Sequence, residues 1–251
     1  MIRAVLFDIG STLWSSPAED PEGLATVYGR GRDALADVAP SLPTLEALVE
    51  AVEGYLAEWE EIWRTDLAQT LQRSTTEFVA DALARLDIQA PDDVLLRFTD
   101  EVMEASVYTA RALPEEPGMA GALDELDSMG LRLACVSNAF MSADVLSRIM
   151  DERGLGRHLE FVISSADAGI RKPHEAIYLA AASRLGLAPE EIVYVGDRVS
   201  ADVEGPAAIG MPGILTHQYR QEDPASGSVT PAAVILHLSD LPEAIRRLNG
   251  E

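Results

Sequence analysis

AVLFDIGSTL, residues 4–13, is the stretch that decides the fold of this chain. Its first four residues are apolar and too few for a stable helix, so they predict a strand that is buried on both faces. The strand ends at Asp8, and a turn of small residues follows it. In open parallel sheets, ligands bind just beyond the carboxyl ends of the strands. Asp8 therefore stands where chemistry is expected, although an Asp here can also form a turn or cap a helix.

The region from Gly118 to the end of the chain alternates between helix and strand patterns. Further strands are predicted at residues 131–136, 161–163, 192–195, 213–215 and 234–238. Helices are predicted between and after them, at residues 119–129, up to about 153, 175–185, 202–209 and 241–248. Such alternation implies right-handed crossovers, and hence an α/β fold with a doubly wound parallel sheet and helices on both faces.

Residues 24–110 have a helical pattern throughout. Apolar residues recur at spacings of three and four in three segments, and prolines separate these segments. No strand pattern interrupts this block. We therefore expect two domains: an α/β core formed by residues 1–16 and 113–251, and an all-helical cap, residues 17–112, inserted after the first strand.

The composition limits the possible partners and location. The net charge is −23, from 42 acidic and 19 basic residues, which argues against nucleic acid or an anionic membrane as a partner. This charge also repels a phosphorylated substrate unless a metal ion or local cations reverse the field at the site. A single cysteine, the lack of a long apolar run and the lack of a signal peptide predict a cytoplasmic protein. The oligomeric state is not readable from the sequence.

Polar side chains follow the first four predicted strands. They are Asp8 after the first, Ser137 and Asn138 after the second, Lys172 after the third, and Asp197 and Asp202 after the fourth. Because the carboxyl ends of parallel strands meet at one edge of a sheet, we expect these side chains to share a pocket. Lys172 is the only lysine among the 19 basic residues, which marks it as a candidate for a specific role.

The chemistry of these residue types fits together. Converging carboxylates raise each other's pKa, so a divalent cation is expected among them, and Mg²⁺ suits an oxygen-only set. An Asp beside such an ion can attack phosphorus and form an aspartyl-phosphate. Ser137 would hold phosphoryl oxygens, and Lys172 would supply positive charge. Taken singly, each residue could equally be a helix cap, a turn or a solvated loop residue.

The four motifs resemble the haloacid dehalogenase-like (HAD) hydrolase superfamily, in the branch with a helical cap after the first core strand. The matching stretches are FDIGSTL (7–13), VSN (136–138), GIRKP (169–173) and GDRVSAD (196–202). The resemblance implies Asp8 as the nucleophile, Lys172 as the charge-balancing lysine, and Thr12 and Ser137 as supporting polar groups.

The same resemblance implies a bound Mg²⁺ and a small phosphorylated substrate. The metal would be held by Asp8, the main-chain carbonyl of Gly10, Asp197 and, directly or through water, Asp202. The residues that we expect to bind the substrate are Ser11, Thr12 and Asn138.

The first motif departs from the family pattern at Gly10. Phosphatases of this family usually carry a second Asp there, as general acid to the leaving group and later as base to water. Gly10 still offers a carbonyl to a metal, but it cannot transfer a proton, and Ser11 replaces the usual glycine. General acid–base catalysis is worth roughly 10²–10⁴-fold, so attack on an ordinary alkyl phosphate should be slow.

Four hypotheses for the function remain open. The first is a Mg²⁺-dependent phosphatase that uses another acid or favours aryl and acyl phosphates. The second is a 2-haloacid dehalogenase-type hydrolase, in which Asp8 attacks carbon; such enzymes need no metal, whereas Asp197 and Asp202 are present here. The third, a phosphonate-cleaving relative, needs a cap lysine, and residues 17–112 contain none. The fourth is a catalytically impaired relative that binds a phosphorylated ligand or a protein.

Substrate choice is expected to come from the cap, which closes over such sites and excludes water. The alternative for each candidate is a place in the cap core or on the surface. The candidates are Trp14, Trp59, Trp63, Arg64, Tyr108 and Arg111.

Overall fold

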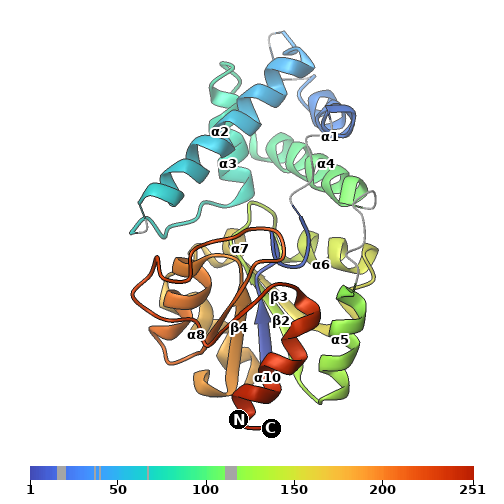
Figure 1. The fold of residues 1–251 in the computed structure, drawn as a ribbon. Coiled ribbons are helices and arrows are strands. Elements are labelled where there is room, and N and C mark those ends of the chain that lie inside the picture. The colour runs from blue at the N-terminus through green and yellow to red at the C-terminus, as the bar shows by residue number, and fades with distance from the viewer. Residues whose placement is uncertain (16–20, 37, 40, 67, 111–117) are drawn as a thin grey trace.

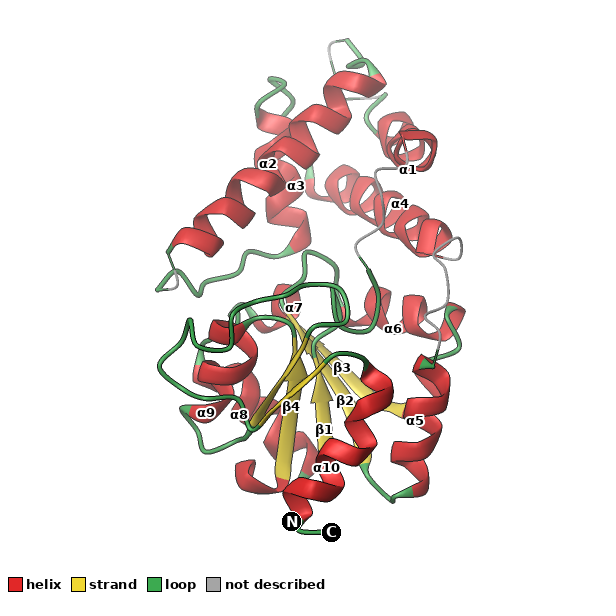
Figure 2. Ribbon diagram, viewed as in Figure 1, coloured by secondary structure: helices red, strands yellow, loops and turns green. Residues whose placement is uncertain are grey.

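The computed structural model describes residues 1–15, 21–36, 38–39, 41–66, 68–110 and 118–251. One parallel sheet has the strand order β3-β2-β1-β4-β5-β6 and confirms the predicted doubly wound α/β fold (Figure 2). Its strands are β1 (Ala4–Phe7), β2 (Arg132–Ser137), β3 (Leu159–Ser164), β4 (Ile192–Gly196), β5 (Gly213–Thr216) and β6 (Ala233–Ile235). The chain reverses its direction of winding between β1 and β4, the kind of place where open sheets bind ligands.

Strand β1 is central because both of its faces are apolar. Val5 and Phe7 belong to the core cluster that includes residues of α5 (Met119–Ser128), α6 (Ala143–Glu152) and α10 (Leu241–Asn249). Ala4 and Leu6 pack in a second cluster with residues of α8 (Glu175–Leu185). The apolar run at residues 4–7 is therefore buried between two helical layers, as predicted.

Two predicted elements differ at their ends. The last strand stops at Ile235 rather than at residue 238, because residues 238–240 form a 3₁₀ turn that leads into α10. The helix predicted at 202–209 begins earlier, as a π-helix, Val199–Glu204, and continues as the short α9, Gly205–Ala207. Between β3 and α8 lies one further short helix, α7, Ser165–Ala168.

Four helices form a separate layer beyond the carboxyl ends of the strands (Figure 1). They are α1 (Pro21–Ala34), α2 (Leu45–Thr65), α3 (Thr75–Ala84) and α4 (Asp92–Ala110). Hydroxyl side chains begin two of them: Thr44 caps α2, and Ser74 caps α3. The helical pattern predicted for this region is confirmed, whereas the exact division into core and cap domains stays a prediction. Among the described residues, no helix has the length and apolar character of a membrane span.

The segment between α2 and α3 pairs with the loop that precedes Lys172. The N–H of Arg171 donates to the carbonyl of Thr70 at 2.7 Å, and the N–H of Gln72 donates to the carbonyl of Gly169 at 3.0 Å. This pairing of two loops was not predicted from the sequence. It ties the helical layer to the part of the core that carries the lone lysine.

Candidate active site

Two side chains from distant parts of the chain, those of Lys172 and Ser137, meet at Asp8. Lys172 Nζ lies 2.8 Å from Asp8 Oδ1. The Ser137 hydroxyl donates to the same oxygen at 3.2 Å. Strands β1 and β2 are paired, with Phe7 opposite Cys135. Asp8 directly follows Phe7, and Ser137 is the last residue of β2, so both lie at the carboxyl ends of neighbouring strands. The structure thus brings the first three predicted sites together.

Lys172 is enclosed by oxygen atoms. Its ammonium donates to Asp8, to Asp202 Oδ1 and to the Tyr194 hydroxyl, each at 2.8 Å. Its side chain is only 2% exposed. Burial alone would lower the pKa of Lys172, but the carboxylates of Asp202 and Asp8 outweigh it and raise this pKa above its usual value. The lysine is therefore a fixed positive charge beside Asp8.

Asn138 fixes the main chain of Lys172 rather than pointing to an open space. Its side-chain oxygen accepts from the Lys172 N–H at 2.8 Å, and its side-chain nitrogen donates to the Lys172 carbonyl at 3.0 Å. Both ends of the amide are thereby used. Asn138 positions the lysine, and its expected contact with substrate stays a prediction.

Asp8, Asp197 and Asp202 form a buried acidic triad. One carboxylate oxygen from each lies within 4.8 Å of the others. Burial, followed by the charges of Asp8 and Asp202, raises the pKa of Asp197 from 3.8 to about 7. Burial also raises the pKa of Asp202, against the opposing effect of Lys172. The triad has the donor chemistry of a hard-cation site, so its residues fit a Mg²⁺ ion.

A glycine and a π-helix let Asp202 reach the triad. A side chain at Gly196 would place its Cβ 2.2 Å from the Asp202 carboxylate, so only glycine fits before Asp197. The other carboxylate oxygen of Asp202 accepts from the Arg198 N–H at 2.9 Å. Asp202 is therefore held inside the first turn of the π-helix, pointing toward the strand ends.

Arg220 is a member of the site that sequence reasoning missed. Its Nε lies 2.6 Å from Asp197 Oδ2, while its side chain is 42% exposed. Arg220 lies on the loop after β5, outside all four motifs, and no local pattern marks it. Together with Lys172 it places two cations in contact with the carboxylates of the triad.

The turn after Asp8 contains the other predicted residues. Gly10 is exposed, and a Cβ built there meets no atom within 4 Å. Ser11 has a left-handed backbone, with φ of +57°, and its N–H donates to the Trp14 carbonyl. Thr12 is fully buried, and its hydroxyl has no hydrogen-bond partner among the described residues. The predicted metal contact of the Gly10 carbonyl stays a prediction.

The cap candidates divide into buried and exposed residues. Trp59 and Trp63 lie in an aromatic cluster with Phe78, and Trp14 is buried in the core. Arg64 is exposed and pairs with Glu61, one helical turn away. The Tyr108 side chain and Arg111 lie outside the described residues.

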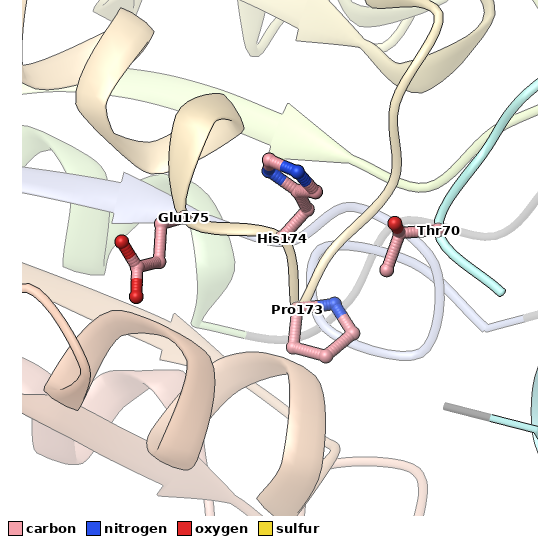
Figure 3. A pocket seen from close by; sticks show the side chains of 4 residues that line it. All are labelled: Thr70, Pro173, His174 and Glu175. Carbon is pink, nitrogen blue, oxygen red and sulfur yellow. The ribbon is translucent and has the colours of Figure 1, made fainter. Parts of the chain in front are cut away.

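A pocket opens at the junction between the helical layer and the lysine loop. Thr70 approaches it from the α2–α3 segment, and Pro173, His174 and Glu175 approach it from the chain just after Lys172 (Figure 3). His174 Nδ1 accepts from the Ala176 N–H and so caps α8. None of the acidic triad lines this pocket, so it lies beside the predicted site rather than at it.

Comparison with known proteins places this geometry in a family. The family model for haloacid dehalogenase-like hydrolases matches residues 2–210. The chain is 28% identical to the glyceraldehyde 3-phosphate phosphatase of Methanopyrus kandleri over 99% of each chain. It is 26% identical to a phosphoglycolate phosphatase of Salmonella choleraesuis, over 87% of this chain and 82% of that one. The solved 2-haloacid dehalogenase of Pseudomonas syringae superposes with a TM-score of 0.65 at 25% identity, over 99% of this chain and 100% of that one.

Proposed function

Because this chain belongs to the haloacid dehalogenase-like hydrolases, we propose that it is a Mg²⁺-dependent phosphatase of a small phosphorylated metabolite. The observation that carries the proposal is the acidic triad around a single buried lysine. Two of the relatives are phosphatases by name, which agrees with this choice.

Asp8 is the proposed nucleophile. One carboxylate oxygen forms a bond to phosphorus while the ester P–O bond breaks, which leaves an aspartyl-phosphate and releases an alkoxide or phenoxide that takes its proton from water. Water then attacks phosphorus, and inorganic phosphate leaves as the Asp8 carboxylate is restored. Lys172 and Ser137 both contact Asp8 Oδ1, so they orient the carboxylate and leave its other oxygen for attack.

The proposed ligands of Mg²⁺ are Asp8, Asp197, the Gly10 carbonyl and, directly or through water, Asp202. A bound Mg²⁺ would supply positive charge to the phosphoryl oxygens. Lys172 supplies further positive charge beside Asp8, and the Thr12 hydroxyl, which has no partner among the described residues, is a donor for a phosphoryl oxygen.

Gly10 limits which esters react quickly. No side chain at this position can protonate the departing alkoxide, so the proposed substrates are esters whose leaving groups need little protonation, such as aryl and acyl phosphates. Alkyl phosphates should react slowly, unless a group from the helical layer donates the proton.

A 2-haloacid dehalogenase is the second candidate, and one contact favours it. Asp197, a proposed metal ligand, is already paired with the cation of Arg220, and this pairing would suit a site that works without metal. The structural similarity to a 2-haloacid dehalogenase agrees with this alternative. The third possibility is a catalytically impaired protein that binds a phosphorylated ligand. A cytoplasmic location and the lack of a nucleic-acid partner remain predictions from composition.

Two assays separate these candidates. The phosphatase hypothesis expects hydrolysis of an aryl phosphate such as 4-nitrophenyl phosphate only with Mg²⁺, and loss of that activity in Asp8→Asn. Halide release from a 2-haloacid without metal would overturn it in favour of the dehalogenase. Inactivity in both assays, together with stabilisation by phosphorylated ligands, would overturn it in favour of a binding protein.

A further inference from the structure

Arg171 is a partly buried cation that makes no salt bridge within the described part of the chain, although the charge of Glu60 acts on it. Its guanidinium carbon lies 3.5 Å from the centre of the Trp63 ring. Its Nη1 donates to the Gln72 side-chain oxygen. Across the described part of the chain, Arg171 takes part in no salt bridge, whereas most other arginines of this acidic protein do. Burial lowers the pKa of Arg171 to about 10, so the group remains charged at neutral pH.

Trp63 adds a second donor without a partner at the same place. The indole N–H is buried and finds no hydrogen-bond acceptor among the described residues, although Trp63 is only 9% exposed. A buried donor without an acceptor costs free energy, and so does a largely desolvated charge with no carboxylate in direct contact. An anionic group beside Arg171 and Trp63 would relieve both costs.

Arg171 belongs to the electrostatic surroundings of the nucleophile. It directly precedes Lys172, and the charges of Glu60 and, to a smaller extent, Asp8 act on it, raising its pKa against the effect of burial. Its stacking partner Trp63 and its hydrogen-bond partner Gln72 come from the helical layer. An anion bound here would therefore touch residues of both layers.

We propose that Arg171 and Trp63 bind a carboxylate of the substrate, which makes phosphorylated carboxylic acids the preferred substrate class. This inference rests on the proposed phosphatase function. Gln72 occupies Nη1, and no described residue accepts a hydrogen bond from Nε or Nη2. The two parallel N–H groups of that edge match the two oxygens of a carboxylate. The opposite end of the same molecule carries the phosphoryl group that Asp8 attacks.

A binding experiment tests this without requiring turnover. Calorimetry with Mg²⁺ compares phosphonoacetate, which carries a phosphonate and a carboxylate, with ethylphosphonate, which lacks the carboxylate. The wild-type protein should bind phosphonoacetate roughly 10- to 100-fold more tightly, as a charge-assisted contact predicts. Arg171→Gln should abolish this ratio, and Arg171→Lys should keep part of it, because lysine retains charge but loses the fork.

Arg184→Gln is the matched control. Arg184 also stacks on an aromatic ring, that of Phe161 at 4.3 Å, but it is exposed on α8 and contacts none of the site residues named above. Its replacement should leave the ratio unchanged. Equal binding of the two phosphonates by the wild type would overturn the inference. An equal loss of affinity for both ligands in Arg171→Gln would also overturn it, because Arg171 would then only hold the helical layer against the core.

Turnover separates this inference from the function on which it rests. The ratio of kcat/KM for 2-phosphoglycolate to that for ethyl phosphate should fall in Arg171→Gln and not in Arg184→Gln. Hydrolysis of both esters without a preference for the acid would overturn the inference alone. Preferential binding of phosphonoacetate with no hydrolysis of either ester would overturn the phosphatase proposal and leave the carboxylate site standing. Tight binding of methylenebisphosphonate, but not of phosphonoacetate, would overturn the inference, because the site would then recognise a second phosphoryl group rather than a carboxylate.

Discussion

Lys172 Nζ and Asp202 Oδ1 lie 2.8 Å apart, and their side chains are 2% and 1% exposed. The same ammonium also contacts Asp8, so one cation links the proposed nucleophile to the carboxylate of the fourth motif. Removing such a partner leaves a buried charge uncompensated, which is far more costly than losing a surface ion pair. The lysine therefore has a structural role as well as its proposed catalytic one.

Replacing Lys172 by Met should unfold the protein more easily and abolish hydrolysis. We expect a loss of about 3–5 kcal/mol in the free energy of unfolding, because Asp202 and Asp8 would repel each other without a cation between them. Urea denaturation measures the loss. The double variant Lys172→Met/Asp202→Asn should recover part of it, since one of the two charges is gone. A single variant as stable as wild type would show that the contact contributes little.

Gly10→Asp should raise the hydrolysis of alkyl phosphates by roughly 10²-fold. The site admits the side chain, because a Cβ at Gly10 meets no atom within 4 Å. The backbone of Gly10 is not left-handed, so a side chain causes no strain there. The gain should be smaller for aryl phosphates, which need less help in leaving. Steady-state kinetics with one ester of each kind measures both effects.

Gly10→Asn is the control for the added acid. It has nearly the same shape as Asp but no proton to transfer, so it should leave the alkyl phosphate rate near that of wild type. If Asn and Asp raised the rate equally, the effect would come from packing or polarity rather than from proton transfer.

The effect of Mg²⁺ on stability should grow with pH up to about 7. Burial raises the pKa of Asp197 to about 7, so the folded protein holds a proton that the unfolded chain loses near pH 4. The stability from this group is complete below about pH 4 and is lost as pH rises through 7. Mg²⁺ binds only the ionised carboxylate, so it competes with this proton at low pH.

Melting curves with and without Mg²⁺ test this dependence. The rise in Tm on adding Mg²⁺ should be small at about pH 5, increase to about pH 7 and then level off. Asp197→Asn should show little rise at any pH. An equal rise at about pH 5 and about pH 8 in the wild type would contradict an ion held by Asp197.

Arg220→Gln should tighten Mg²⁺ binding by roughly tenfold, since a cation now paired with Asp197 would be gone. Its side chain is 42% exposed, so the effect should shrink as salt is added. Calorimetric titration with Mg²⁺ at low and high ionic strength measures it. Arg157→Gln, which removes a surface arginine paired with Asp124, is the matched control. Weaker Mg²⁺ binding in Arg220→Gln would mean that the arginine helps to hold the metal site together.

Residues at strand ends could be predicted because strand position alone sets where they lie. An apolar run that stops at Asp8 or Asp197 fixes the sheet edge at which the carboxylate sits, and parallel pairing then brings the strand ends together. The lone Lys172 was marked by its rarity, and its contact with Asp8 agrees with that expectation.

Contacts made by loops between distant segments could not be predicted in this way. Arg220 reaches Asp197 from the loop after β5, and Gln72 reaches Arg171 from the α2–α3 segment. Loops carry no periodic pattern that sets their register against a partner. Tyr194 is a further case: its place in the apolar strand β4 predicts burial, but not that its hydroxyl accepts a hydrogen bond from Lys172.

Ser11→Gly should stabilise the protein by about 1 kcal/mol, because Ser11 has a left-handed backbone that glycine adopts at little cost. Asp87→Gly is the matched control: Asp87 has the same backbone, with φ of +56°, but lies after α3, far along the chain from the nucleophile. Both variants should gain similar stability in urea denaturation. If the Ser11 hydroxyl binds substrate, as predicted, only Ser11→Gly should raise KM. An unchanged KM would remove Ser11 from the substrate-binding set and leave the strain at that position to be explained by the turn alone.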